Sequence, residues 1–120
     1  MPRFSVVYTT SFSAGHRLED HPGKCRRMHG HNYLVRVWVE GGLDEKNMVI
    51  DYYELKSIVD GVVDELDHRV LNDVLGDRNP TSELIARWIA ERVSEKLPGR
   101  VRVSRVEVCE TGDFCASYEP

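Results

Sequence analysis

Two segments near the start of the chain alternate between apolar and polar positions, which is the pattern of a strand with one buried face. In the first, the side chains of one parity are Phe4, Val6, Tyr8, Thr10, Phe12 and Ala14, and His16 continues that parity. The second covers residues 31–40 and has an apolar and a mixed face: Tyr33, Val35, Val37 and Val39 against Leu34, Arg36 and Trp38. Both are predicted to be β-strands, joined by a long polar loop over residues 15–30.

Two further strands are predicted near the end of the chain, over residues 101–110 and 114–118, with a glycine-containing turn between them. In the first of these strands the apolar positions change parity between Val103 and Val106. A change of parity within one strand indicates an extra residue, so we expect a β-bulge near residues 104–105.

The middle of the chain carries two segments in which apolar residues recur every three or four positions, the spacing of a helix with one buried face. The first follows Asp51, a residue type that caps helix N-termini, and its apolar stripe runs from Leu55 to Leu66. The second follows Asn79, the predicted cap, and has Pro80 in its first turn. Each helix therefore has one face to bury against the strands.

The element order ββααββ predicts an α+β fold, with a four-stranded antiparallel sheet and both helices on one of its faces. We expect a single domain over residues 1–120. Two sheet edges and one sheet face stay uncovered in this arrangement. Trp38, or the face that carries Val35, Val37 and Val39, must then be buried against something else, so we expect the chain to self-associate.

The composition narrows the class of protein. With 120 residues, of which 41 % are hydrophobic and 30 % charged, the chain is long enough for one globular core. The net charge of −4 argues against a nucleic-acid-binding domain, and charged residues interrupt every apolar stretch before it reaches the length of a membrane span. Three cysteines are too few for a disulfide scaffold, and the N-terminus lacks the apolar block of a secretion signal. The expected location is a reducing cytoplasm.

Three histidines are spaced so that a metal ion could bind between them. His29 and His31 are two residues apart, so their rings point to the same side of an extended chain. If the first two strands pair, His16 at the end of the first strand completes a set of three imidazoles. Three neutral nitrogen ligands with an open fourth position are typical of a catalytic zinc site, and three unrelated loop histidines are the alternative.

Cys25 lies four residues before His29 and is flanked by three basic residues, Lys24, Arg26 and Arg27. Its thiol is a fourth ligand that closes the metal site, a free thiolate that the basic neighbours favour, or a loop cysteine without a role. The spacing is compatible with all three. The basic side chains themselves form either a solvated charge run or a phosphate-binding cluster.

Two acidic residues are further candidates. Asp67 precedes His68 where the first helix ends, an arrangement that orients an imidazole for proton transfer but also occurs as a simple helix cap. Glu110 shares the parity of Val106 and Val108, so its carboxylate is expected to face inward. It then either accepts hydrogen bonds from the N–H groups of a ligand or ends an exposed strand.

These motifs, in this order, resemble those of the 6-pyruvoyl-tetrahydropterin synthase family across nearly the whole chain. The matching segments are FSAGH at 12–16, CRRMHGHNY at 25–33, VIDYYEL at 49–55, LDHRVLN at 66–72, NPTSE at 79–83 and CET at 109–111. The resemblance implies the tunnelling fold, with zinc bound by His16, His29 and His31. It also implies a hexamer built as a dimer of trimers.

The same resemblance implies roles for the remaining candidates. Cys25 corresponds to the proton acceptor of the family, and the Asp67–His68 pair and Glu110 correspond to the catalytic residues that assist it. The residues implied to contact the substrate are Glu110, which anchors the pterin ring, Thr81, Ser82 and Thr111.

The implied substrate is 7,8-dihydroneopterin triphosphate. The gap of three residues between Cys25 and His29 is similar to that of the 6-carboxytetrahydropterin synthases of deazapurine (queuosine) biosynthesis, which release acetaldehyde and triphosphate. The alternative is the pyruvoyl-forming branch, which eliminates triphosphate. Two other classes compete with both: a non-catalytic zinc- or pterin-binding module, against which the intact cysteine argues, and a zinc hydrolase, whose H-E-x-x-H helix motif this sequence lacks.

Overall fold

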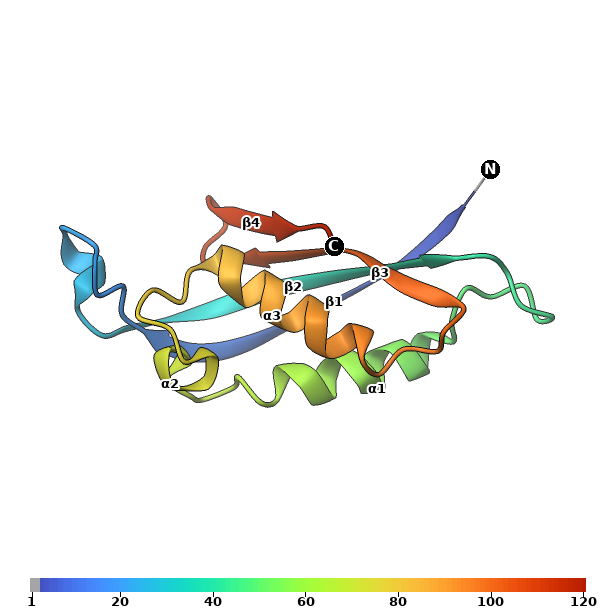
Figure 1. Ribbon diagram of the computed structural model, residues 1–120, viewed down its shortest axis with the longest axis horizontal. Helices are drawn as coiled ribbons and strands as arrows, with labels where there is room; N and C mark the ends of the chain where they lie inside the picture. Colours follow the sequence, from blue (N-terminus) through green and yellow to red (C-terminus); the bar gives the residue numbers. More distant parts are fainter. Residues whose placement is uncertain (1–2) are drawn as a thin grey trace.

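The computed structural model describes residues 3–120, and within this range an antiparallel sheet is covered on one face by helices (Figure 1). The strands lie in the order β1-β2-β3-β4, each antiparallel to its neighbour. Their bounds are β1 Phe4–His16, β2 His29–Gly41, β3 Val101–Cys109 and β4 Cys115–Tyr118. The α+β fold predicted from the element order is confirmed.

In the described part of the chain, three α-helices and one short 3-10 helix connect the strands. They are η1 Lys24–Arg26, α1 Tyr52–Val63, α2 Leu71–Leu75 and α3 Ser82–Ser94. Helix α1 begins as predicted, because the Asp51 side chain accepts hydrogen bonds from the backbone N–H groups of Tyr53 and Glu54 at 2.8 and 3.2 Å. It ends at Val63, and Leu66 is fully buried in the turn that follows, so the apolar stripe extends beyond the helix itself.

Two details of the helix prediction are wrong. Helix α3 is capped by Thr81, whose hydroxyl accepts a hydrogen bond from the Leu84 N–H at 3.3 Å, whereas the Asn79 amide binds the Asp20 carboxylate at 2.7 Å. Pro80 therefore precedes the helix instead of forming its first turn. Helix α2 is absent from the prediction, because five residues are too few to display a helical repeat.

The first two strands pair over their full length. The register runs from Phe4 opposite Gly41 to His16 opposite His29. Strand β2 thus begins two residues earlier than predicted, and the polar loop is confined to residues 17–28. Figure 1 shows this loop extending beyond one end of the sheet.

The register of β2 with β3 shifts by one residue between Trp38 and Val39. Their partners are Arg105 and Val103, so Ser104 is the extra residue and the predicted β-bulge is confirmed. Trp38 lies on the mixed face of β2, where the Arg105 guanidinium is 4.9 Å from the centre of its ring.

The core lies between the sheet and helices α1 and α3. The β2 side chains predicted to share an apolar face are fully buried there: Tyr33, Val35, Val37 and Val39. Burial of each of the three valines is worth roughly 1.5–3 kcal/mol. This face is therefore the one that the helices cover, and within residues 3–120 the face that carries Trp38 has no helix on it.

Candidate active site

The three histidines meet at the end of the β1–β2 pair. His16 is the last residue of β1 and lies opposite His29, and His31 lies opposite Ala14 on the same inward face. The ring centroids are 4.6 Å apart for His16 and His29, 5.0 Å for His29 and His31, and 5.4 Å for His16 and His31. One ligand nitrogen of each lies within 4.8 Å of the other two. The strand pairing thus assembles the predicted set of three imidazoles.

Backbone carbonyls hold two of the rings in one tautomer. The Pro80 carbonyl lies 2.9 Å from His16 Nδ1, and the Arg27 carbonyl lies 2.7 Å from His29 Nδ1. Since a carbonyl only accepts, both Nδ1 atoms carry a proton, and in the neutral form of each ring the lone pair is then on Nε2. An outer-shell carbonyl on the second ring nitrogen is the usual support of a metal-binding histidine.

Burial favours the neutral form of His16. Removal from water lowers the pKa of this fully buried side chain, and the neighbouring His29 and His31 act in the same direction, against the Pro80 carbonyl and Glu110. The Nε2 atoms of His16 and His31 are buried without a hydrogen-bond partner among residues 3–120. Neutral imidazoles with unpaired, converging nitrogens are what a divalent metal requires, so these residues fit such an ion.

Glu110 lies at the edge of the histidine cluster. Its carboxylate oxygens are 3.8 Å from His16 Nε2 and 3.7 Å from His31 Nε2. The inward orientation predicted from the parity of β3 is confirmed. The side chain is about one-third exposed, so it borders the cluster while remaining open to a ligand from outside.

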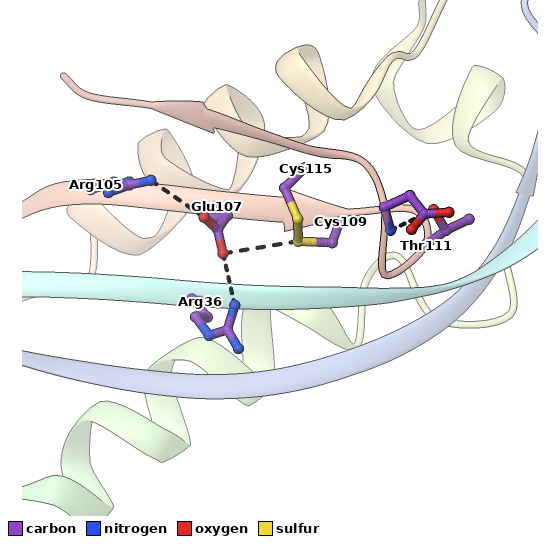
Figure 2. The surroundings of a disulfide bond; sticks show 7 residues. Arg36, Arg105, Glu107, Cys109, Thr111 and Cys115 are labelled. Carbon is purple, nitrogen blue, oxygen red and sulfur yellow. Dashed lines mark hydrogen bonds and ion pairs between the residues drawn. A yellow bond between two sulfur atoms is a disulfide. The ribbon is translucent and has the colours of Figure 1, made fainter.

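A disulfide joins the two ends of the hairpin that carries Glu110. Cys109 and Cys115 are opposite each other on β3 and β4 and are bonded through their sulfur atoms (Figure 2). Three cysteines in the sequence do not predict this bond, and the bond is at odds with the reducing compartment expected from them, in which disulfides are rare. Inside the hairpin, the Thr111 hydroxyl accepts a hydrogen bond from the Asp113 N–H at 3.2 Å.

Asp67 and His68 form a pair tied to β1. The Asp67 carboxylate lies 2.9 Å from His68 Nδ1 and accepts a hydrogen bond from the Ser13 N–H at 2.9 Å. These two donors, the Ser13 N–H first, hold the pKa of Asp67 below its usual value. The His68 backbone is left-handed at φ 58°, and its ring is 82 % exposed. His68 lines an open groove of about 460 Å³, and His31 also lines this groove.

Cys25 lies apart from the metal-ligand set. It belongs to η1, is half-buried, and has a free thiol. Within residues 3–120, the three histidines bring one ligand atom each within 4.8 Å of one another, and Cys25 does not belong to this group. In the same part of the chain the flanking Lys24, Arg26 and Arg27 form no ion pair with a carboxylate, although Arg78 nearby does.

Two further residues, Pro80 and Asn72, support the site, and the sequence analysis assigns no role in it to either. Pro80 contributes only its carbonyl, which no sequence motif reports. Asn72 is buried in α2, where its side chain accepts from the Arg17 N–H at 3.0 Å and donates to the Arg17 carbonyl at 2.9 Å. In the sequence, Asn72 is marked only by its place in the segment LDHRVLN at 66–72, which carries the family resemblance. Thr81 and Ser82, predicted to contact the substrate, lie at the N-terminus of α3 next to Pro80.

The fold and site together define an α+β domain with three converging imidazoles, a carboxylate at their edge, and a groove that His31 shares with His68, the partner of Asp67. The family model described as 6-pyruvoyl tetrahydropterin synthase matches residues 5–120. The chain belongs to this family and is an enzyme of the tetrahydropterin synthase class.

Individual relatives support the same placement. The chain is 44 % identical to the 6-carboxy-5,6,7,8-tetrahydropterin synthase of Synechocystis sp., over 94 % of this chain and 92 % of that protein. It is 41 % identical to the dihydroneopterin monophosphate aldolase of Pyrococcus furiosus, over 95 % and 96 %. Among solved structures, the 6-pyruvoyl tetrahydropterin synthase of Caenorhabditis elegans matches with a TM-score of 0.87 and 30 % identity, over 100 % of this chain and 97 % of that one.

Between residues 3 and 120, no helix has both the length and the apolar character needed to cross a membrane.

Proposed function

We propose that this enzyme is a zinc-dependent lyase that converts 7,8-dihydroneopterin triphosphate to 6-carboxy-5,6,7,8-tetrahydropterin, with release of acetaldehyde and triphosphate. The observation that carries the proposal is the cluster of three imidazoles with the Glu110 carboxylate at its edge. Family membership and the three-residue gap between Cys25 and His29 support the choice of substrate and product.

The three histidines are the residues that would hold the zinc ion. Bound there, zinc would act as a Lewis acid on the hydroxyl groups of the substrate side chain and would make the adjoining C–H bonds more acidic. The chain's contribution is to favour the neutral form of His16 through burial and to orient the rings of His16 and His29 through the carbonyls of Pro80 and Arg27.

The remaining site residues bind the ring and move protons. Glu110 accepts two hydrogen bonds from the N–H groups of the pterin's aminopyrimidine edge, for which a carboxylate is well suited. Cys25 takes a carbon-bound proton as a thiolate. Asp67 holds the His68 ring by its Nδ1–H, so that the opposite nitrogen can exchange protons along the substrate side chain. Thr81, Ser82 and Thr111 line the part of the site in which the pterin binds.

The basic residues around Cys25 bind the triphosphate. Lys24, Arg26 and Arg27 lie on or next to η1, and the absence of carboxylate partners within residues 3–120 leaves their charges available to a polyanion.

The enzyme assembles as a hexamer, a dimer of trimers, and acts in the cytoplasm. Strands β1 and β4 are the edges of the sheet, and bulky side chains near β1 are exposed, among them Phe4, Val7, Tyr52 and Tyr53. An unpaired edge strand with exposed apolar side chains favours association with another copy.

A second candidate is an aldolase that acts on a pterin monophosphate. It is favoured by the 41 % identity to the Pyrococcus furiosus aldolase over nearly the whole chain. The zinc hydrolase considered from the sequence needs a carboxylate beside its metal, and Glu110 meets that requirement. The family match over residues 5–120 nevertheless favours an enzyme that acts on a pterin.

Product analysis tests the proposal. The zinc-loaded enzyme is incubated with 7,8-dihydroneopterin triphosphate and, separately, with the monophosphate. Acetaldehyde and the 6-carboxy product from the triphosphate support it. A dicarbonyl pterin without acetaldehyde would assign the pyruvoyl-forming reaction, and a phosphorylated two-carbon aldehyde from the monophosphate would assign the aldolase. No turnover of either would refute all three.

A further inference from the structure

A buried phenol beside the histidine cluster makes no polar contact that explains it. Tyr33 is fully buried, and its hydroxyl has no hydrogen-bond partner anywhere in residues 3–120. An unpaired buried hydroxyl destabilises a folded chain, and nearly all such groups in proteins are paired. Phenylalanine would fill the same space without that penalty. The hydroxyl therefore indicates a partner that binds from outside the chain.

The neighbours of Tyr33 are residues of the candidate active site. Its ring stacks on Phe12, with centroids 4.9 Å apart, and meets the rings of His31 and His16 edge-on at 5.4 and 5.9 Å. The β2–β3 register, continued one residue past the end of β3, places Glu110 opposite Tyr33. The phenol thus adjoins both the metal-binding and the proposed ring-binding groups.

The unpaired buried atoms gather at this place. Four side-chain nitrogen or oxygen atoms in the described part of the chain are buried without a partner: Tyr33 Oη, His16 Nε2, His31 Nε2 and Arg105 Nε. Three of these four belong to the site. The two imidazole nitrogens suit a metal, whereas a phenol O–H suits an oxygen acceptor. A phenol is protonated at neutral pH, so the Tyr33 hydroxyl can act as the donor.

We propose that Tyr33 is a further substrate-contacting residue, whose hydroxyl donates a hydrogen bond to a side-chain hydroxyl oxygen of the bound pterin. This rests on the proposed function, since it takes the substrate to be a pterin with a hydroxylated side chain. Glu110 serves the ring, and Tyr33, beside His31, serves the side chain at the metal. The contact discriminates against pterins that lack the side chain, because the buried donor then stays unpaired.

The test is the variant Tyr33→Phe, which removes only the oxygen atom. Dissociation constants are measured on zinc-loaded protein for 7,8-dihydroneopterin and for 7,8-dihydropterin, which has no side chain. We expect the constant for dihydroneopterin to rise about fivefold to tenfold, the worth of one hydrogen bond, and that for dihydropterin to stay within about twofold. Zinc content should not change. Urea unfolding of the ligand-free variant should show no loss of stability, because no protein hydrogen bond is broken.

Tyr8→Phe is the matched control. The Tyr8 hydroxyl donates to Asp60 at 2.7 Å and accepts from Lys56 at 3.0 Å, so its loss should destabilise the fold and leave both dissociation constants unchanged. Unchanged affinity of Tyr33→Phe for dihydroneopterin overturns the inference, as does equal weakening of both ligands or a loss of zinc. If the unmodified protein turns over the triphosphate and Tyr33→Phe binds dihydroneopterin with unchanged affinity, the inference about Tyr33 is refuted and the proposed function stands. An unmodified protein that binds neither pterin refutes the proposed function and this inference with it.

Discussion

Asn72 clamps the chain next to His16, and its removal should weaken both the fold and the metal site. The side chain is 7 % exposed and makes three hydrogen bonds, two to the backbone of Arg17 at 3.0 and 2.9 Å and one to the Arg78 carbonyl at 3.3 Å. Arg17 follows His16 directly, and Arg78 lies two residues before Pro80, whose carbonyl holds the His16 ring. The perturbation is Asn72→Ala.

The expected loss of stability follows from these contacts. Each well-made hydrogen bond is worth about 0.5–1.5 kcal/mol net, and the bond to Arg78 is longer and weaker. Arg17 is only half-buried, so water replaces part of what its backbone loses. We expect the free energy of unfolding of the metal-free protein to fall by about 2 kcal/mol. With a typical urea m-value of about 1.5 kcal/mol per molar, the unfolding midpoint moves down by about 1.3 M.

Urea unfolding and zinc titration of the same preparations check this prediction. Asp73→Ala, at an exposed position of the same helix, is the control and should stay within about 0.5 kcal/mol of the unmodified protein. Zinc affinity should drop in Asn72→Ala alone, because only there is the segment that ends in His16 released. An unfolding midpoint equal to the control's would refute the clamp. A lowered midpoint with unchanged zinc affinity would refute its link to His16.

The remaining predictions concern the metal, the proton acceptor, the phosphate and the assembly. The protein should contain about one zinc per chain and His29→Ala should lose most of it; full zinc content in that variant would exclude the histidine site. Cys25→Ala should keep its zinc and its pterin affinity while kcat falls about a hundredfold or more. Loss of zinc there would make Cys25 a ligand, and unchanged kcat would make it a bystander. Arg26→Ala should raise KM for the triphosphate more than for an unphosphorylated analogue, whereas Arg87→Ala, on the exposed face of α3, should change neither; equal effects of Arg26→Ala on both substrates would remove the phosphate role. Light scattering should report about six chains per particle, and an active monomer at micromolar concentration would contradict the assembly.

The position of the cluster on one face of the sheet was predictable from strand periodicity. A strand has a period of two, so His29, His31 and Tyr33 must share a side, and the parity that buries Val106 and Val108 also turns Glu110 inward. The bulge at Ser104 was visible for the same reason, because an inserted residue shifts the parity of every position after it. The Asp51 cap was local too, since the side chain and the N–H groups it binds lie within three residues.

What the tertiary structure decided are contacts between segments far apart in the chain. Asn79 and Thr81 are both good capping residues, and Asn79 lost the role because its amide binds Asp20, some sixty positions away. The fixed tautomer of His16 depends on a carbonyl 64 residues later, and every residue type has a carbonyl. From the sequence alone, Tyr33 is predicted to be an ordinary core residue, because it shares the apolar parity of Val35 and Val37. Only the folded chain shows that its hydroxyl is buried and unpaired beside His31, because hydrogen-bond satisfaction depends on three-dimensional neighbours and not on residue order.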